Sequence, residues 1–115
     1  MRELRAPIGI DQGSKMLFAD FANGGPMWTG SGERETRIQI TFTTPFHQQP
    51  AVMVGMSLWD IASDTNSRMD LSAEAITKKG FQLVFKTWGD TRIARVRAEW
   101  TAIGALKDDD DWDVE

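Results

Sequence analysis

Apolar residues recur at every second position along most of this chain, and this spacing constrains its fold more than any other feature. In residues 34–42, Ile38 and Ile40 alternate with polar side chains. A similar alternation covers residues 80–88 and 92–103. Because successive side chains of a β-strand point to opposite faces, each segment is predicted to be a strand with one face against a core.

Three further segments, residues 15–21, 51–59 and 69–76, complete a predicted set of six strands. Residues 51–59 differ from the others because both of their faces are fairly apolar. That pattern fits a central strand covered on both sides. It fits equally a strand whose second face meets another subunit, and the sequence leaves both interpretations open.

Glycine, proline and asparagine break the pattern between these segments. The strongest breaks are at residues 23–26, 30–32, 44–45, 49–50, 79–80 and 89–90. Residues 78–80 and 88–91 are both predicted to be short hairpin turns between consecutive strands. Strands about ten residues apart, each followed by a turn, indicate an antiparallel sandwich or barrel, and no segment has helix-capping signals. A single all-β domain is therefore predicted over residues 1–106.

The composition argues against several classes of protein. The 115 residues include no cysteine, which removes disulfide frameworks and thiolate metal sites. The net charge of −4 argues against a nucleic-acid partner, whose phosphates require a basic surface. No apolar run approaches the ~20 residues that span a bilayer, and the N-terminal residues lack the apolar segment of a secretory signal, so no membrane insertion is expected. The compartment stays open: cytoplasmic synthesis and a non-classically released assembly both fit.

Residues 107–115 carry much of the negative charge, including four consecutive aspartates at 108–111. Like charges repel one another, and only Trp112 and Val114 in this segment are apolar. The segment is therefore predicted to be a solvated, disordered tail that lies outside the domain.

Residue types that carry catalysis or bind metals are scarce. His47 is the only histidine, and no nucleophile motif accompanies it, so it is predicted to be a loop residue. Without a histidine cluster, P-loop or dinucleotide motif, neither a metal nor a cofactor is expected. The carboxylates that could form a glycosidase pair are Asp60, Asp64, Asp70, Glu74 and Asp90. A hydrolase would need two of them about 5–9.5 Å apart across a cleft, whereas turn and surface roles explain each one singly.

Several polar or aromatic residues fall in predicted loops or at strand ends. They are Arg34, Asp60, Asn66, Arg68, Trp88, Asp90 and Arg92. Arginine and aspartate offer fixed donors and acceptors to sugar hydroxyls, and an indole face packs against the C–H face of a pyranose. The alternative is that Trp88 is a core or subunit-contact residue and that the charges cap turns.

Short motifs in this chain occur in the order and spacing of a known family. They are Ile40-x-Phe42, Trp59-Asp60, Asn66-x-Arg68, Gly80-Phe81, Trp88-Gly89-Asp90-Thr91 and Trp100-x-Ala102. The series resembles the H-type lectin domain of the snail agglutinins and of the C-terminal part of the slime-mould discoidins, from about Trp28 to Ile103. The resemblance implies a six-stranded antiparallel β-sandwich that binds glycans without catalysis. It also implies a homotrimer whose sites lie at subunit interfaces and favour galactose or N-acetylgalactosamine.

The resemblance also implies which residues form the sugar site. Position by position they are the segment Gly30-Ser31-Gly32-Glu33, the arginine Arg68, and the loop Trp88-Gly89-Asp90. The snail lectins carry a histidine where this chain has Gly89, and a family aromatic that flanks the sugar falls at Ala94. Their cysteines are absent. The alternative function is therefore a structural trimerisation or appendage module of a larger assembly, with a degenerate sugar site.

The position of Arg68 along the chain favours the same assignment. It follows the polar residues 63–67 and precedes a predicted strand, which places it at a rim. Arg95 and Arg97 alternate with core residues in mid-strand and are expected to face solvent. Arg34 also follows a glycine loop and is the chief rival of Arg68.

One feature of the residues themselves favours a trimer. Met53, Val84 and Trp88 place apolar atoms on faces that should be polar in a monomer. A closed three-fold ring would bury such faces.

Overall fold

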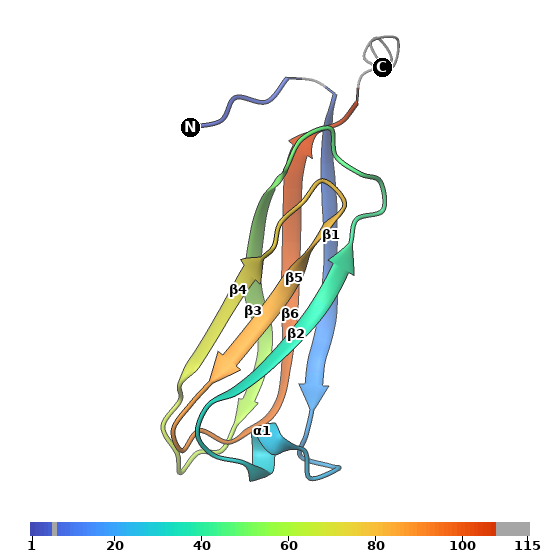
Figure 1. Ribbon diagram of the computed structural model, residues 1–115. Helices are drawn as coiled ribbons and strands as arrows, with labels where there is room; N and C mark the ends of the chain where they lie inside the picture. The colour runs from blue at the N-terminus through green and yellow to red at the C-terminus, as the bar shows by residue number, and fades with distance from the viewer. Residues whose placement is uncertain (6, 108–115) are drawn as a thin grey trace.

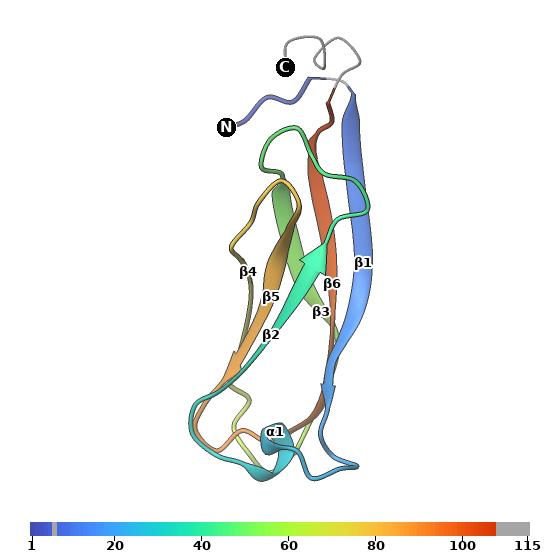
Figure 2. The ribbon, with the colours of Figure 1, turned by 45° about the vertical axis from the view of Figure 1, so that its right-hand side comes forward.

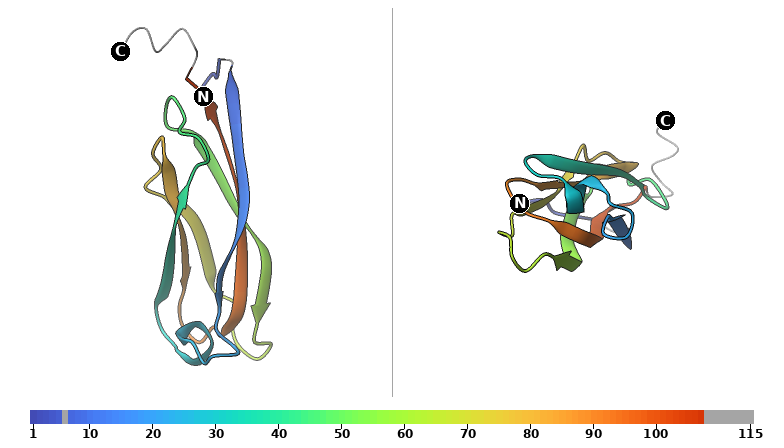
Figure 3. Two further views of the ribbon diagram at one scale, coloured as in Figure 1. Left: turned by 90° about the vertical axis from the view of Figure 1, so that its right-hand side faces the viewer. Right: turned by 90° about the horizontal axis from the view of Figure 1, so that it is seen from below.

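The computed structural model describes residues 1–5 and 7–107, which form six β-strands and one short helix. The strands are β1 (Ile8–Ala19), β2 (Arg34–Thr41), β3 (Ala51–Ile61), β4 (Met69–Glu74), β5 (Gly80–Thr87) and β6 (Ile93–Ala105), and the helix is α1 (Pro26–Thr29). All strand pairs are antiparallel and form two sheets, with the orders β1-β6-β3 and β2-β5-β4 (Figure 1). The sheets lie face to face (Figures 2 and 3), so the predicted six-stranded β-sandwich is confirmed.

The boundary predicted between a domain of residues 1–106 and a tail of residues 107–115 stays a prediction, because all of that tail except Lys107 lies outside the described residues. Among the described residues, no helix has the length and apolar character needed to cross a membrane.

The core fills the space between the sheets, and the central strands β5 and β6 supply most of it. Phe81, Leu83 and Phe85 of β5 are fully buried, as are Val96 and Ala98 of β6. These strands correspond to two of the three segments with the clearest alternation. Their apolar positions therefore mark the inner faces of the two sheets, as predicted.

Residues 51–59 form most of β3, which lies at the edge of its sheet. The interpretation as a central strand is therefore wrong; β6 has that place. Met53 exposes 56% and Trp59 57% of its surface, so the apolar second face of this segment is not covered within the chain. The other interpretation, that this face meets another subunit, stays a prediction.

β1 is longer than predicted and begins at Ile8 instead of residue 15. Its first half contains glycines, which usually weaken a strand. Gly13, however, is required by packing: a Cβ atom there would lie 2.2 Å from Cζ2 of Trp100 on β6. The glycine lets the indole lie against the backbone of β1, a reason that only the packed structure reveals.

The segment 88–91 connects two different sheets, because β5 and β6 are not paired with each other. The predicted hairpin at this point is therefore wrong, although the turn itself exists. Residues 78–80 do lie in a hairpin, since β4 and β5 are antiparallel neighbours. A crossing between sheets leaves 88–91 at the end of the sandwich, where it meets other loops (Figure 1).

The one-turn helix α1 was not predicted, because four residues are too few to show a helical period. Proline stands in its first turn, where its missing N–H costs nothing. The backbone N–H of Met27 donates to Oδ2 of Asp20 at 2.9 Å, and Met27 is buried. α1 thus closes one end of the sandwich.

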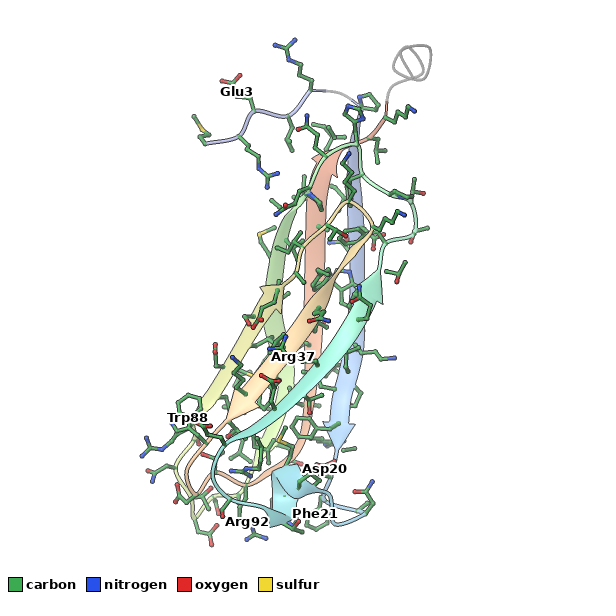
Figure 4. All side chains as sticks on the ribbon, viewed as in Figure 1. Glu3, Asp20, Phe21, Arg37, Trp88 and Arg92 are labelled. Carbon is green, nitrogen blue, oxygen red and sulfur yellow. The ribbon has the colours of Figure 1, made fainter. Side chains whose placement is uncertain are left out.

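The outer face of the β2-β5-β4 sheet carries a charged network centred on Arg37 (Figure 4). Its Nε lies 2.8 Å from Oε2 of Glu35, and its Nη1 lies 3.3 Å from Oε1 of Glu74 on β4, so the side chain reaches across β5. The hydrogen bond from Arg37 holds the pKa of Glu35 below its ordinary value. Val84 is fully buried and pairs with Arg37 in the sheet register. Val84 thus lies on the outer face, as predicted, but neighbours in the same chain cover it, so it offers no apolar surface to another subunit.

Candidate functional site

The residues predicted for a sugar site gather at the end of the sandwich closed by α1. They are Gly30, Ser31, Gly32, Glu33, Arg68, Trp88, Gly89 and Asp90. They lie in three connections, between α1 and β2, before β4, and between β5 and β6 (Figure 1). The N–H of Gly32 donates to the carbonyl of Gly89 at 2.9 Å, and a Cβ on Gly89 would lie 3.4 Å from Cδ of Arg68. A single chain therefore brings all three connections together.

Gly32 and Gly89 both adopt left-handed backbone conformations, with φ of 76° and 71°. Glycine takes up this region without steric cost. Gly89 stands where the snail lectins carry a histidine, and its φ gives a physical reason for glycine at this position. Any side chain there would also meet Arg68.

Arg34 holds these connections in place. Its Nε donates to the carbonyl of Gly32 at 3.0 Å, and its Nη2 to that of Gly89 at 3.4 Å. Its Nη1 donates to the carbonyls of Met27 at 3.2 Å and Pro26 at 3.4 Å. These bonds occupy the guanidinium, so Arg34 positions the loops, whereas the side chain of its rival Arg68 is exposed.

The backbone of Arg68 is fixed by two buried threonines. Its N–H donates to Oγ1 of Thr91 at 3.1 Å, and its carbonyl accepts from Oγ1 of Thr87 at 2.6 Å. Its side chain is exposed, and its guanidinium makes no hydrogen bond within the described residues. Arg68 is therefore an anchored residue with a free functional group at the rim.

Asp90 contributes to the loop structure beside Arg68. Its Oδ1 accepts from Nδ2 of Asn66 at 3.2 Å, and its Oδ2 accepts from the N–H of Asn66 at 3.4 Å. These hydrogen bonds, first the one from the Asn66 side chain, lower the pKa of Asp90, and the charge of Arg68 acts in the same direction. The rim thus keeps an ionised carboxylate at neutral and mildly acidic pH.

A hollow of about 430 Å³, here called the Trp88 hollow, adjoins these loops. It is lined by Glu33, Arg34, Glu35, Asp70, Lys86, Thr87 and Trp88. Trp88 exposes 40% of its surface, so the core interpretation of this residue is wrong. Asp70 and Lys86 are cross-strand partners next to Trp88, and sequence reasoning did not combine them because β4 and β5 had no established register. The available signal in the sequence was that each of the two residues occupies an outward-facing position of a strand with alternating polar and apolar residues.

Of the eight predicted residues, only Glu33 and Trp88 line the hollow; the other six do not. The N–H of Gly30 donates to the carbonyl of Pro26 at 2.8 Å and ends α1. Ser31 is exposed in the connection to β2. Of the predicted segment only Glu33 therefore reaches the hollow, while Gly32, Arg68, Gly89 and Asp90 lie in the loops beside it.

Comparison with known proteins identifies the family. The model of the H-type lectin domain matches residues 37–103. The chain belongs to the H-type lectin domain family. A protein of Fuscovulum blasticum named "ATP synthase subunits region ORF 7" is 62% identical to this H-type lectin domain over 115 residues, the full length of both. Discoidin-2 of Dictyostelium discoideum is 30% identical over 76 residues, which are 65% of this chain and 30% of the discoidin.

The fold of this H-type lectin domain is also that of a solved discoidin. The structure of discoidin II from Dictyostelium discoideum superposes with a TM-score of 0.75 at 22% identity, covering 93% of this chain and 41% of that one. The chain thus spans less than half the length of these discoidins. Family and fold are of a non-catalytic kind associated with carbohydrate binding. The carboxylates considered for hydrolysis include Asp60, Glu74 and Asp90, and each of these makes a structural contact to a neighbouring side chain.

Proposed function

We propose that this H-type lectin domain binds galactose- or N-acetylgalactosamine-type glycans non-covalently at the Trp88 hollow, without catalysis. The observation that carries the proposal is the anchored, exposed Arg68 beside Gly89, adjoining the hollow that Trp88 and Glu33 line. A pyranose has one apolar C–H face and a rim of hydroxyls. The indole of Trp88 would pack against that face, while Arg68 donates to hydroxyls and Glu33 accepts from them.

Arg68→Lys should weaken binding of methyl galactoside by about 1–3 kcal/mol without changing the fold. Lysine keeps the charge but lacks the planar fork that holds two vicinal hydroxyls at once. Isothermal titration calorimetry measures the change. Arg97→Lys is the matched control, because Arg97 lies on β6 of the other sheet, donates to Ser57 and does not line the hollow. Unchanged affinity in Arg68→Lys would show that the site is assigned to the wrong residue.

We also propose that the domain acts as a homotrimer with sugar sites near its subunit contacts. Met53, Trp59 and Trp88 leave large apolar surfaces exposed in the single chain. Burial of such surfaces favours association, and three weak sites on one particle gain avidity on a repetitive glycan surface.

Multi-angle light scattering at micromolar concentration should give three times the mass of one chain. A monomer at that concentration would contradict the trimer. A trimer that binds no glycan on an array would instead support the alternative function, a structural assembly module. Loss of the trimer in Arg68→Lys would place Arg68 in a subunit contact.

A further inference from the structure

A second hollow, of about 400 Å³, lies at the same end of the sandwich but is lined from the other sheet. Its lining residues are Ala19, Phe21, Ala22, Trp28, Asp60, Ile61, Ala94 and Arg95. We call it the Phe21 hollow. It shares no residue with the Trp88 hollow, and its strand residues come from β1, β3 and β6.

An exposed phenyl ring stands at this hollow on an anchored stretch of backbone. Phe21 exposes 63% of its surface, yet its N–H donates to the carbonyl of Ala94 at 3.3 Å, and the N–H of Asp20 donates to the same carbonyl at 2.7 Å. The ring meets Trp28 edge-on at 5.0 Å between centroids (Figure 4 shows Phe21 and Arg92 at this end). An anchored aromatic ring that stays exposed to water contributes little to the stability of the fold, and it offers a contact surface to a ligand.

Trp28 is itself fixed from the side. The guanidinium of Arg92 lies 4.3 Å from the centroid of its ring, and Nε of Arg92 donates to the carbonyl of Trp28 at 3.0 Å. Stacking and hydrogen bonding by one arginine leave the indole little freedom. The aromatic wall of the Phe21 hollow is therefore built before any ligand arrives.

The polar lining of the hollow is an ion pair at its edge. Nε of Arg95 lies 3.5 Å from Oδ2 of Asp60, and the two side chains are 51% and 56% exposed. A pair this exposed contributes little to stability. The pair does present a carboxylate acceptor beside the guanidinium donors. Ala19 and Ala94 have small side chains and leave the neighbouring surface open.

We propose that the Phe21 hollow is a second saccharide-binding site. A pyranose would lay its apolar C–H face against Phe21 and direct its hydroxyls to Asp60 and Arg95. The volume fits one ring of this size, since small-ligand sites begin at about 300 Å³. The inference rests on the proposed function in that the domain binds glycans, but on none of the eight residues predicted for the first site. Ala94, the position at which a family aromatic flanks the sugar, is the one point of contact with that prediction, because it lines the Phe21 hollow.

Calorimetric titration of the full chain with the methyl pyranosides of galactose, N-acetylgalactosamine, glucose, mannose and fucose tests the inference. The parent should show two sites per chain across this panel. Phe21→Ala should weaken one of them about tenfold, Asp60→Asn should weaken the same one, and Phe21→Trp should retain it. Arg68→Lys should affect only the other site.

The outcomes separate the two sites. Binding that responds to Arg68→Lys but to neither Phe21→Ala nor Asp60→Asn overturns the second site and leaves the proposed function standing. Binding that responds to Phe21→Ala alone upholds the second site and overturns the first. No binding of any pyranoside overturns both. A lower particle mass in Phe21→Ala also overturns the second site, because the hollow would then be a contact between copies; Asp60→Asn repeats the test if Phe21→Ala does not fold.

Discussion

Gly80→Ala should lower the free energy of unfolding by about 3 kcal/mol, the upper part of the usual range for over-packing. A Cβ on Gly80 would lie 2.1 Å from the carbonyl oxygen of Ile40, which is backbone and cannot rotate away. The strand cannot shift easily, because the Gly80 carbonyl accepts from the N–H of Thr77 at 2.9 Å and the residue pairs with Thr41 on β2. Urea denaturation of parent and variant measures the difference.

Gly55→Ala provides the matched control. Gly55 is also a strand glycine, on β3, but a Cβ there would meet no atom within 4 Å. The stability of this variant should stay within about 0.5 kcal/mol of the parent. Equal losses in the two variants would mean that strand conformation, and not the contact with Ile40, determines the cost at Gly80.

The parts of the fold that could be predicted are those where one strand face is buried and the other is not. β6 fulfils this condition, with Arg95 and Glu99 exposed between buried residues. β5 shows the same alternation in sequence except at Val84, which is buried on the outer face. The alternation in these two strands predicts the fold class and the inner faces.

β1 does not fulfil this condition, because Gly9 and Gly13 replace side chains where Leu106 and Trp100 pack against it. In a sequence such glycines look like breaks in a strand. That they leave room for a packed side chain is evident only when the packing partner is known.

The candidate site shows a similar limit. Arg68, Trp88 and Gly89 could be chosen from loop position and from resemblance. Whether 88–91 turns back within a sheet or crosses to the other sheet is not encoded in its length, so the meeting with Gly32 could not be foreseen. Phe21 was likewise missed, since its only signal was an aromatic residue before a glycine-rich loop.

Loop position alone could not separate Arg34 from Arg68, since both follow polar loops; only the resemblance favoured Arg68. The distances separate them: Arg34 donates to backbone carbonyls of α1 and of both glycine loops, whereas the Arg68 side chain is exposed. Arg34→Met keeps the length of the side chain and removes every donor. We expect it to weaken methyl galactoside binding about 100-fold, because Gly32 and Gly89 lose their common anchor and the rim around Arg68 loosens.

Amide hydrogen exchange distinguishes this positioning role from general destabilisation. In Arg34→Met the N–H of Gly32, which donates to Gly89, should exchange far faster, while the amides of Leu83 and Val96 in the core remain protected. Arg34→Lys should give an intermediate affinity, since one ammonium can reach only part of the carbonyls that the guanidinium joins. If Arg34→Met binds with wild-type affinity, the positioning role is contradicted. Loops that have lost their common anchor should no longer hold Arg68 and Trp88 in position for a sugar.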